Sequence, residues 1–170
     1  MNCINCGAPA RLLYDKGYFI CDYCNSLFIP NETDEGIVNF GERSDVNCPV
    51  CKIQLVFARI SNNPVLYCER CRGLLINAYI FLKTVEALRA RPSHPPLPPI
   101  PMDPDDLHRV VHCPYCGKTM DTHPYGGPGN IVIDNCADDA VNWLDYKEFT
   151  RVISAPGEDR GEWPKKKRRN

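Results

Sequence analysis

Ten of the eleven cysteines form five pairs with two residues between the members of each pair, and Cys136 stands alone. A Cys-x-x-Cys turn places two thiolates on one tight loop, close enough to share a metal ion. Zinc takes four such ligands in a tetrahedron, so two turns that face each other complete a site. The five pairs are Cys3 and Cys6, Cys21 and Cys24, Cys48 and Cys51, Cys68 and Cys71, and Cys113 and Cys116.

The spacing between the pairs predicts two complete zinc sites. The first two turns are separated by 14 residues (7–20) and the next two by 16 residues (52–67), which suits a β-hairpin that returns the second turn to the first. We therefore expect one four-cysteine site from the first two pairs and another from the next two. Haem attachment would need a histidine directly after a pair, and none follows. Redox thiols usually form one pair at the start of a helix, unlike the five pairs in series here. A rubredoxin-like iron site uses the same ligands, so iron remains an alternative to zinc.

A third site is expected to include a carboxylate. Cys113, Cys116 and Cys136 supply three thiolates, and Asp139 lies three residues after Cys136, where the second unit has Cys71. Zinc accepts carboxylate oxygen, so Asp139 is the favoured fourth ligand. Three thiolates with a weak fourth ligand also match a catalytic zinc that activates water, but no acid or base stands nearby at a recognisable spacing, and we favour a structural site. The rival fourth ligands are Asp138, His112, His123 and water.

The second unit is expected to consist of a hairpin and a helix. Residues 55–60 and 65–67 read as strands on either side of a turn at 62–64. A helix with apolar residues at helical spacing follows from Asn77, its predicted N-cap. Arg89 and Arg91 lie in the last turn of this helix, where they complement the helix dipole.

The third unit repeats this design. A β-branched strand is expected at 130–134, and a helix follows in which Asp145 and Glu148 form an approximate capping box. The two units therefore look like copies of one another. With their turns aligned, Leu75 corresponds to Trp143, Ile76 to Leu144 and Phe81 to Phe149.

Together these elements predict a small metal-bound α+β fold of three tandem zinc ribbons built on β-hairpins, the second and third each followed by a short helix. The first unit, in which Gly17 marks the hairpin turn, is too small to bury an adequate core, so its folding energy must come from the metal. The predicted order is zinc ribbon 1 at 1–30, an acidic, solvated linker at 31–46, ribbon 2 with its helix at 47–91, a proline-rich linker at 92–106, ribbon 3 with its helix at 107–156 and a basic tail at 157–170.

The near-neutral net charge of −1 conceals an acidic body and a basic end. The chain has 20 Lys and Arg against 21 Asp and Glu, and without five consecutive basic residues near its end the balance is 15 against 21. This balance disfavours a body that binds nucleic acid and leaves the tail as the candidate contact with it. The five residues are Lys165, Lys166, Lys167, Arg168 and Arg169.

Composition also bears on localisation. No apolar run reaches the roughly eighteen residues of a membrane-spanning helix, so no membrane span is expected. The beginning, MNCINCGAPA, lacks a charged and then apolar leader, so no secretory signal is expected. Eleven cysteines without an export signal indicate a reducing compartment, where paired thiols bind metal. We expect a cytoplasmic protein, or a nuclear one if the host is eukaryotic.

The second and third units resemble the transcription-factor-IIB-type zinc-ribbon family. The motifs are CPVC…CERCRGLLI in the second unit and CPYCGKTMD…YGGPGNIVIDNC…NWLDYKEF in the third, which together cover about half of the chain. The family usually has a second complete Cys-x-x-Cys pair, and Asp139 departs from that pattern. The resemblance implies a zinc-ribbon structure more than an activity, because a shared ribbon is a weak argument for DNA binding.

The family also has a Gly-x-Trp-Leu-Asp run followed by a helix that begins with Glu. The second unit keeps the glycine as Gly73 but has Leu75 in place of the tryptophan and Asn77 in place of the aspartate. The third unit matches the pattern at Trp143, Leu144, Asp145 and Glu148.

The expected function is that of a non-enzymatic adaptor or scaffold that binds a protein partner or a larger assembly. Rigid, metal-bound units joined by a proline-rich spacer present several small faces, which suits the binding of one large partner at several points. The alternatives are a nucleic-acid-associated, transcription-related regulator that uses the basic tail and a metal-dependent enzyme or zinc sensor centred on the third site.

Overall fold

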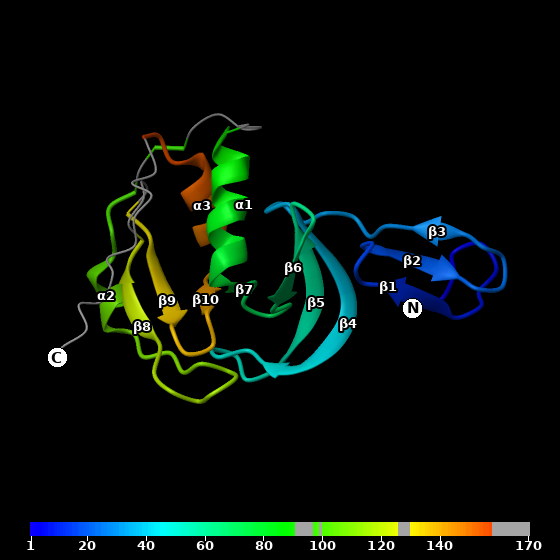
Figure 1. Cartoon of the computed structure of the whole chain (residues 1–170), viewed down its shortest axis with the longest axis horizontal. Helices are drawn as coiled ribbons and strands as arrows, with labels where there is room; N and C mark the ends of the chain where they lie inside the picture. Colours follow the sequence, from blue (N-terminus) through cyan, green and yellow to red (C-terminus); the bar gives the residue numbers. More distant parts are fainter. Residues whose placement is uncertain (91–96, 99, 126–129, 158–170) are drawn as a thin grey trace.

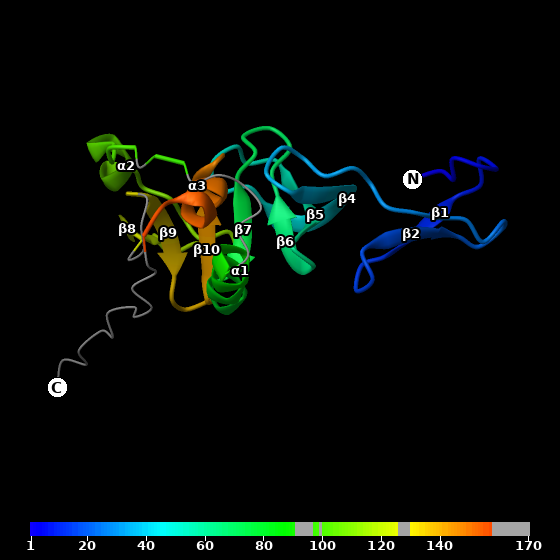
Figure 2. The same cartoon turned by 90° about the horizontal axis from the view of Figure 1, so that it is seen from above.

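The structure is a computed structural model that describes residues 1–90, 97–98, 100–125 and 130–157. Its described part is mostly β, with ten strands and three helices. The strands form a three-stranded sheet at the N-terminus and a seven-stranded sheet that carries the helices (Figure 1). The N-terminal sheet lies at one end of an elongated molecule (Figure 2).

The N-terminal sheet has the antiparallel order β1-β2-β3, with β1 at Ala10–Leu13, β2 at Tyr18–Cys21 and β3 at Leu27–Phe28. The hairpin turn predicted at Gly17 is confirmed: its φ is +72° and its N–H donates to the carbonyl of Leu13 at 2.8 Å. The register places Cys21 opposite Ala10, which returns the second cysteine turn to the first.

An aromatic cluster joins this small sheet to the large one. Phe19 is fully buried, stacks on Phe28 at 5.1 Å between ring centroids and meets the edge of Phe40 at 6.1 Å. Tyr14 packs edge-on against Phe57 at 5.0 Å. Because Phe40 and Phe57 belong to the large sheet, the N-terminal unit completes its small core by contact with the rest of the molecule.

The large sheet has the order β4-β5-β6-β7-β10-β9-β8, and all its neighbouring strands are antiparallel. The second and third units thus share one continuous sheet, joined where β7 pairs with β10. The strands are β4 (Ile37–Asn47), β5 (Gln54–Ile60), β6 (Asn63–Tyr67), β7 (Leu74–Asn77), β8 (Asp121–Pro124), β9 (Val132–Cys136) and β10 (Val141–Leu144).

Two strand boundaries differ from the sequence-based expectation. The sequence predicts the turn between β5 and β6 at 62–64, but the turn consists of Ser61 and Asn62, both with positive φ (44° and 68°). Two left-handed residues give the tight hairpin turn whose twist matches its flanking strands, so Pro64 lies within β6, opposite Arg59. The strand expected at 130–134 is β9, two residues further along the chain.

The segment 31–46, expected to be an acidic and solvated linker, contains the edge strand β4 and a buried acidic residue. Glu35 exposes only 8% of its surface, and its Oε1 accepts the N–H of Lys147 at 2.7 Å. Asp34 forms an ion pair with Arg72 and accepts the hydroxyl of Tyr146 at 3.0 Å. These contacts attach the segment to the second and third units.

The helix of the second unit is α1 (Ala78–Ala90), and its predicted N-cap is confirmed. The side chain of Asn77 accepts the N–H groups of Tyr79 at 3.0 Å and Ile80 at 3.3 Å. Arg89 lies in the last turn of α1, as predicted, and its guanidinium donates to the carbonyls of Val152 and Ala155, at the end of the helix of the third unit. Arg91 lies outside the described residues.

The third unit contains α3 (Glu148–Ser154), and an unpredicted short helix, α2 (Pro104–His108), spans the boundary between the proline-rich linker and this unit. Only half of the expected capping box is present: Glu148 Oε2 accepts the N–H of Asp145 at 2.7 Å, whereas the side chain of Asp145 faces Arg109 and Trp143. Residues 92–96 and 99 of the proline-rich linker and the whole basic run fall outside the described residues, which exclude 91–96, 99, 126–129 and 158–170.

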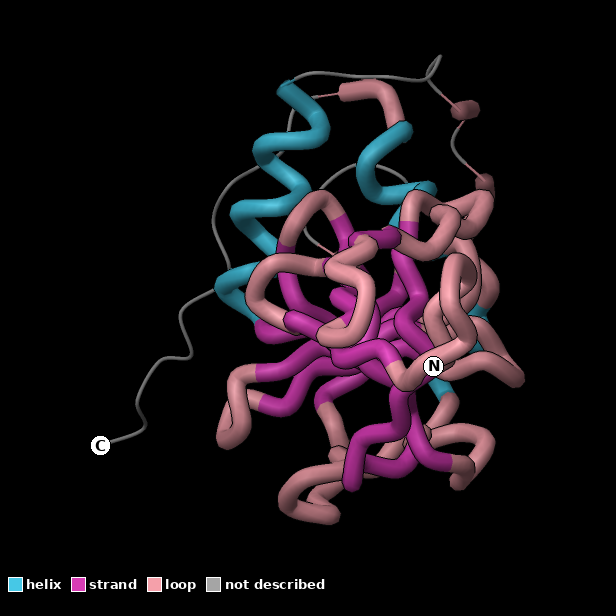
Figure 3. Tube along the Cα trace, turned by 90° about the vertical axis from the view of Figure 1, so that its right-hand side faces the viewer, coloured by secondary structure: helices cyan, strands magenta, loops and turns pink. Residues whose placement is uncertain are grey.

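The two faces of the large sheet carry different cores. Helices α1 and α3 cover one face side by side (Figures 1 and 3), with Phe81 and Phe149 in edge-on contact at 6.3 Å. The core of the opposite face contains Leu75, Trp143 and cysteines of the second and third units. Metal-ligand candidates therefore share a core with the centre of the sheet. No helix in the described ranges has the length and apolar character needed to cross a membrane.

Candidate metal centres

The twelve residues predicted as ligands lie in three groups of four. Within each group the ligand atoms all lie within 4.8 Å of one another, so each group can hold a metal ion. The groups are Cys3, Cys6, Cys21 and Cys24; Cys48, Cys51, Cys68 and Cys71; and Cys113, Cys116, Cys136 and Asp139.

The distances between sulfur atoms suit a shared metal ion and not disulfides. A disulfide requires about 2.05 Å between sulfurs. Four sulfurs at about 2.3 Å from a tetrahedral zinc lie about 3.8 Å apart along the edges of the tetrahedron. The Sγ–Sγ distances are 3.5 Å for Cys3–Cys24 and Cys6–Cys21, and 3.7 Å for Cys48–Cys71 and Cys116–Cys136.

The five Cys-x-x-Cys turns share one backbone geometry. In each, the carbonyl of the first cysteine accepts the N–H four residues later at 2.8–3.0 Å, and its own N–H donates to the carbonyl five residues later at 2.7–3.0 Å. The residue after the second cysteine has a φ between 57° and 75°, which turns the chain sharply and brings both thiols to one side. These residues are Gly7, Asn25, Lys52, Arg72 and Gly117.

The sixth turn has a carboxylate in place of the second thiol. Ala140, directly after Asp139, has the corresponding positive φ of 51°. Asp139 Oδ2 lies 3.1 Å from Cys113 Sγ and 3.3 Å from Cys136 Sγ. The edge of a tetrahedron with one oxygen and one sulfur ligand is about 3.5 Å, so this oxygen is placed to be a fourth ligand.

The rival ligands point elsewhere. Asp138 forms a surface ion pair with Lys118 at 2.7 Å. His112 is exposed in the bridge that pairs it with Thr119. His123 lies in β8, with its Nδ1 3.0 Å from the carbonyl oxygen of Asp121. None of the three belongs to the third group.

Local contacts set the protonation of the ligand groups. At the third site, burial raises the pKa of Cys113 to about 12, while hydrogen bonds from Cys116 and Cys113 lower the pKa of Asp139. At the first site, the hydroxyl of Ser26, 3.0 Å from Cys24 Sγ, lowers the pKa of Cys24 to about 6. A metal ion that binds the high-pKa thiol must displace its proton, so metal binding at the third site strengthens as the pH rises.

A buried polar network supports the third site from β9 and β10. Asp134 is fully buried, accepts the hydroxyl of Thr122 at 2.6 Å and forms an ion pair with Arg109. Arg109 also pairs with Asp145, which accepts the indole N–H of Trp143 at 3.0 Å. The network fixes the position of Trp143 and of the strand that ends at the third site.

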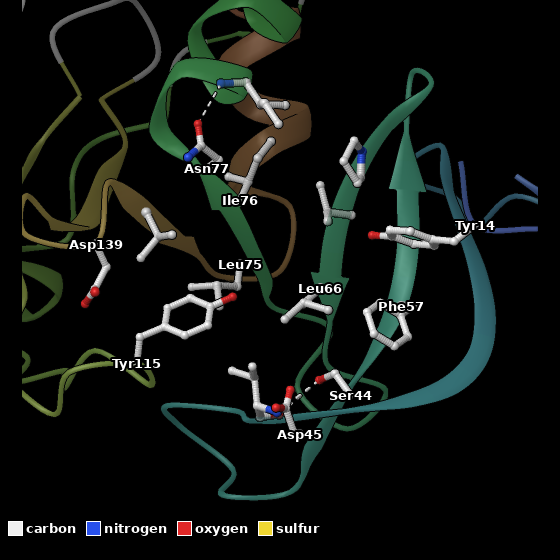
Figure 4. A pocket seen from close by; sticks show the side chains of 15 residues that line it. Tyr14, Ser44, Asp45, Phe57, Leu66, Leu75, Ile76, Asn77, Tyr115 and Asp139 are labelled. Carbon is white, nitrogen blue, oxygen red and sulfur yellow. Dashed lines mark hydrogen bonds between the residues drawn. The ribbon is translucent and has the colours of Figure 1, made fainter. Parts of the chain in front are cut away.

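An open pocket of about 580 Å³ lies beside the third site (Figure 4). Its floor is apolar, and residues of all three units contribute to its walls. The hydroxyls of Tyr14 and Tyr115 point toward each other across it (Figure 4). The lining residues are Tyr14, Ser44, Asp45, Val46, Phe57, Pro64, Val65, Leu66, Leu75, Ile76, Asn77, Ile80, Tyr115, Asp139 and Val141.

Reasoning from the sequence missed the buried ion pair and the pocket. Asp134 interrupts an apolar, β-branched strand, and such an interruption signals a buried partner, but nothing local identifies that partner as Arg109. Tyr115 stands between two ligands in the chain, so its exposure at 52% was foreseeable, whereas its approach to Tyr14 depends on how the units pack.

No known protein family, no curated protein and no solved structure matches this chain. The assignment of its sites therefore depends on the geometry of the three groups and on their surroundings.

Proposed function

We propose that the chain is a non-enzymatic zinc-ribbon protein whose three metal centres hold a rigid scaffold that binds another protein. The second and third units are then zinc ribbons of the transcription-factor-IIB type, and the first is a plainer ribbon. Zinc is the preferred metal because thiolate-rich tetrahedral sites with four protein ligands are typical of structural zinc. Iron fits the same spacing, and metal analysis distinguishes the two.

The observation that carries the proposal is the composite pocket. Tyr14 comes from the first unit, Leu66 from the second and Tyr115 from the third, so the pocket exists only when all three units are folded and packed. Small units of this kind depend on metal for their folding. Metal binding therefore assembles one binding surface from three separate parts of the chain.

The surroundings of the third centre favour a structural role over catalysis. A catalytic zinc would need an open coordination position and an acid or base in a pocket. Among the described residues that line the pocket there is no histidine, lysine or arginine, and the only carboxylates are Asp45 and Asp139. Asp139 lies between two thiols, and the side chains of Asp138 and His123 lie outside the pocket.

Metal analysis and partner capture test the proposal together. The purified chain should contain three zinc ions, and a tagged chain should co-purify a defined partner. Tyr115→Ala should release that partner while keeping all three metals. Tyr23→Ala is the matched control, because Tyr23 occupies the same place in a metal turn, is 83% exposed and does not line the pocket. Fewer than three metals, or equal loss of partner in both variants, would contradict the proposal.

A further inference from the structure

The pocket of Figure 4 combines two carboxylates with an apolar floor and several neutral polar groups. Its charged lining residues within the described chain are Asp45 and Asp139, and it has no basic one. Asp45 is exposed and forms no ion pair with any residue of the described ranges. An unpaired carboxylate beside an apolar floor attracts a cation that carries its own apolar stem.

The polar groups on the rim are placed to receive the cationic head of such a ligand. The hydroxyls of Tyr14 and Tyr115 face each other across the pocket, with Leu66 and Leu75 between them (Figure 4). Ser44 is already engaged, since its Oγ donates to the carbonyl of Leu55 at 2.9 Å. The tyrosines and Asp45 are therefore the groups available to a cationic head, while the leucines pack against its methylenes.

Two basic residues near this site, Arg59 and Lys118, make polar contacts of their own. The guanidinium of Arg59, whose positive charge opposes the rise that burial causes in the pKa of Tyr14, donates to the carbonyl of Asn62 at 2.6 Å. Lys118 pairs with Asp138 at the surface. Neither residue lines the pocket, so the described chain leaves the charge of the pocket unbalanced.

The third metal centre forms one wall of the pocket. Tyr115 stands between the ligands Cys113 and Cys116, and Asp139 is both a candidate ligand and a lining residue. A zinc ion held by three thiolates and one carboxylate has a formal charge of −2, so this wall stays negative when the metal is bound. Loss of the metal would remove the bonds that tie Asp139 and the turn carrying Tyr115 to the other ligands.

We propose that this pocket binds an extended peptide segment that carries lysine or arginine beside an apolar residue, and that this binding requires metal at the third centre. The inference rests on the proposed scaffold function and names the partner class and the regulation of the same site. The volume lies within the range of about 300–1,000 Å³ typical of ligand pockets, which suits a short segment and not a folded domain. By linkage, the segment also strengthens metal binding at that centre.

The third centre is suited to this regulation because it has one ligand of a different kind. A carboxylate is a harder ligand than a thiolate, and zinc prefers the softer donor in sites of this type. As zinc becomes scarce, the centre with three thiolates empties before the two with four. The pocket then loses its wall while the other two centres remain loaded.

The first test measures binding of a fluorescein-labelled hexapeptide of alternating leucine and lysine to the zinc-loaded full chain by fluorescence anisotropy. The matching leucine–glutamate peptide should bind at least tenfold more weakly. Asp45→Asn and Tyr115→Ala should each weaken binding of the lysine peptide three- to tenfold. Asp138→Asn, which removes a carboxylate outside the pocket, and Tyr23→Ala should leave it unchanged. Equal binding of the two peptides would overturn the inference.

The second test varies the metal. A chelator titration that removes one zinc ion per chain, the one at the third centre, should abolish binding of the lysine peptide. The Asp139→Cys variant should keep its third zinc ion and its peptide binding at the same chelator concentration. Full binding by chain that holds two zinc ions would overturn the metal requirement. A chain that holds three zinc ions yet shows no charge preference would overturn the peptide assignment and leave the scaffold proposal standing. Fewer than three zinc ions after full loading would instead contradict the scaffold proposal.

The same assay separates a partner from the basic tail of the chain itself. Substitution of Lys165, Lys166 and Lys167 by glutamine, in the full chain, should change the affinity for the lysine peptide less than threefold. A tenfold gain would mean that the tail competes for the pocket, and the pocket would then be assigned to the tail and not to a partner.

Discussion

Leu75 and Trp143 pair directly across the junction of β7 and β10, at the centre of the seven-stranded sheet. They are also equivalent positions of the two repeats, with the same offset of 68 residues that separates Cys68 from Cys136. On either side, Leu74 pairs with Leu144 and Ile76 with Asn142. The offset of 68 makes Leu74 equivalent to Asn142 and Ile76 equivalent to Leu144, so the symmetry converts each of these pairs into the other. The second and third units are therefore related by an internal two-fold axis through the Leu75–Trp143 pair.

The helices obey the same symmetry. Phe81 and Phe149 are equivalent by the offset and contact each other edge-on at 6.3 Å. The axis thus passes between Leu75 and Trp143 on one face of the sheet and between the two phenylalanines on the other. Two repeats that each have an exposed edge strand bury that edge against each other, which removes two unpaired strand edges at once.

Packing at the axis combines a small and a large residue. Gly73 lies against the indole of Trp143 so closely that a methyl group at Gly73 would overlap the ring. The positions equivalent to Gly73 and Trp143 are Val141 and Leu75, a larger and a smaller residue in the same core cluster. Volume removed on one side of the axis is therefore matched by volume added on the other.

Gly73→Ala should destabilise the chain because the indole cannot move away. The ring is held by the hydrogen bond from its N–H to Asp145 and is fully buried. Overpacking of this kind costs about 1–3 kcal/mol. Trp143→Phe should be destabilising alone but should partly relieve Gly73→Ala, so a double-mutant cycle by urea denaturation should give a favourable coupling energy. Additive effects would show that the two side chains do not clash.

Removal of the first metal centre should unfold the N-terminal sheet alone. Cys21→Ser removes a buried candidate ligand, and we expect a unit of this size to depend on metal for its folding. The bound metal should fall from three to two per chain, and hydrogen exchange should accelerate in β1 and β2 while β5 to β7 stay protected. Ser26→Ala, which keeps four thiols, is the control. Retained protection in β1 and β2 would show that contact with Phe40 suffices to hold the sheet.

Local signals in the sequence predicted the cysteine turns and the start of α1. A Cys-x-x-Cys turn and an N-cap such as Asn77 depend on residues within a few positions of each other, so their types and spacing carry the information. The hairpin turn at Gly17 was predictable for the same reason. These parts of the fold need no knowledge of where the rest of the chain lies.

The junction of the two repeats could not be predicted in this way. The sequence alignment made Leu75 and Trp143 equivalent, but equivalence does not imply contact, because two copies can also fold as separate units. The acidic composition of 31–46 indicated a solvated linker, but this segment contributes to β4, whose hydrogen bonds come from the partner strand β5. The same composition gave no sign that Glu35 is buried against the start of α3. Such features depend on contacts between distant segments of the chain. Glu35 and Lys147, for example, are more than 100 residues apart in the sequence.

Arg89 should stabilise the helix of the opposite repeat. Its guanidinium donates to the carbonyls of Val152 at 2.7 Å and Ala155 at 2.9 Å, where α3 ends and the helix dipole is negative. Arg89→Met keeps the aliphatic stem and should lower the free energy of unfolding by about 1–2 kcal/mol. Lys83→Met, at an exposed position of α1, should change it by less than about 0.5 kcal/mol. Equal effects would mean that the loss comes from surface charge alone.

Glu148 should make the folded chain less stable as the pH rises toward 8. Burial raises the pKa of Glu148 to about 8 in the folded protein, from an ordinary value of 4.5. Between these two pH values the unfolded chain has lost the proton that Glu148 keeps in the folded chain. The stability that this protonated side chain contributes is therefore complete below pH 4.5 and is lost as the pH rises through 8.

Glu148→Gln cannot lose this proton and still accepts the N–H of Asp145. Its free energy of unfolding relative to the wild type should therefore rise between pH 6 and 8.5, by at most about 1.4 kcal/mol per pH unit. Urea denaturation in excess zinc measures the difference, since the metal-dependent part is common to both proteins. Glu86→Gln, at an exposed position of α1, controls for the removal of a carboxylate. A constant difference across this pH range would show that Glu148 is already ionised in the folded state.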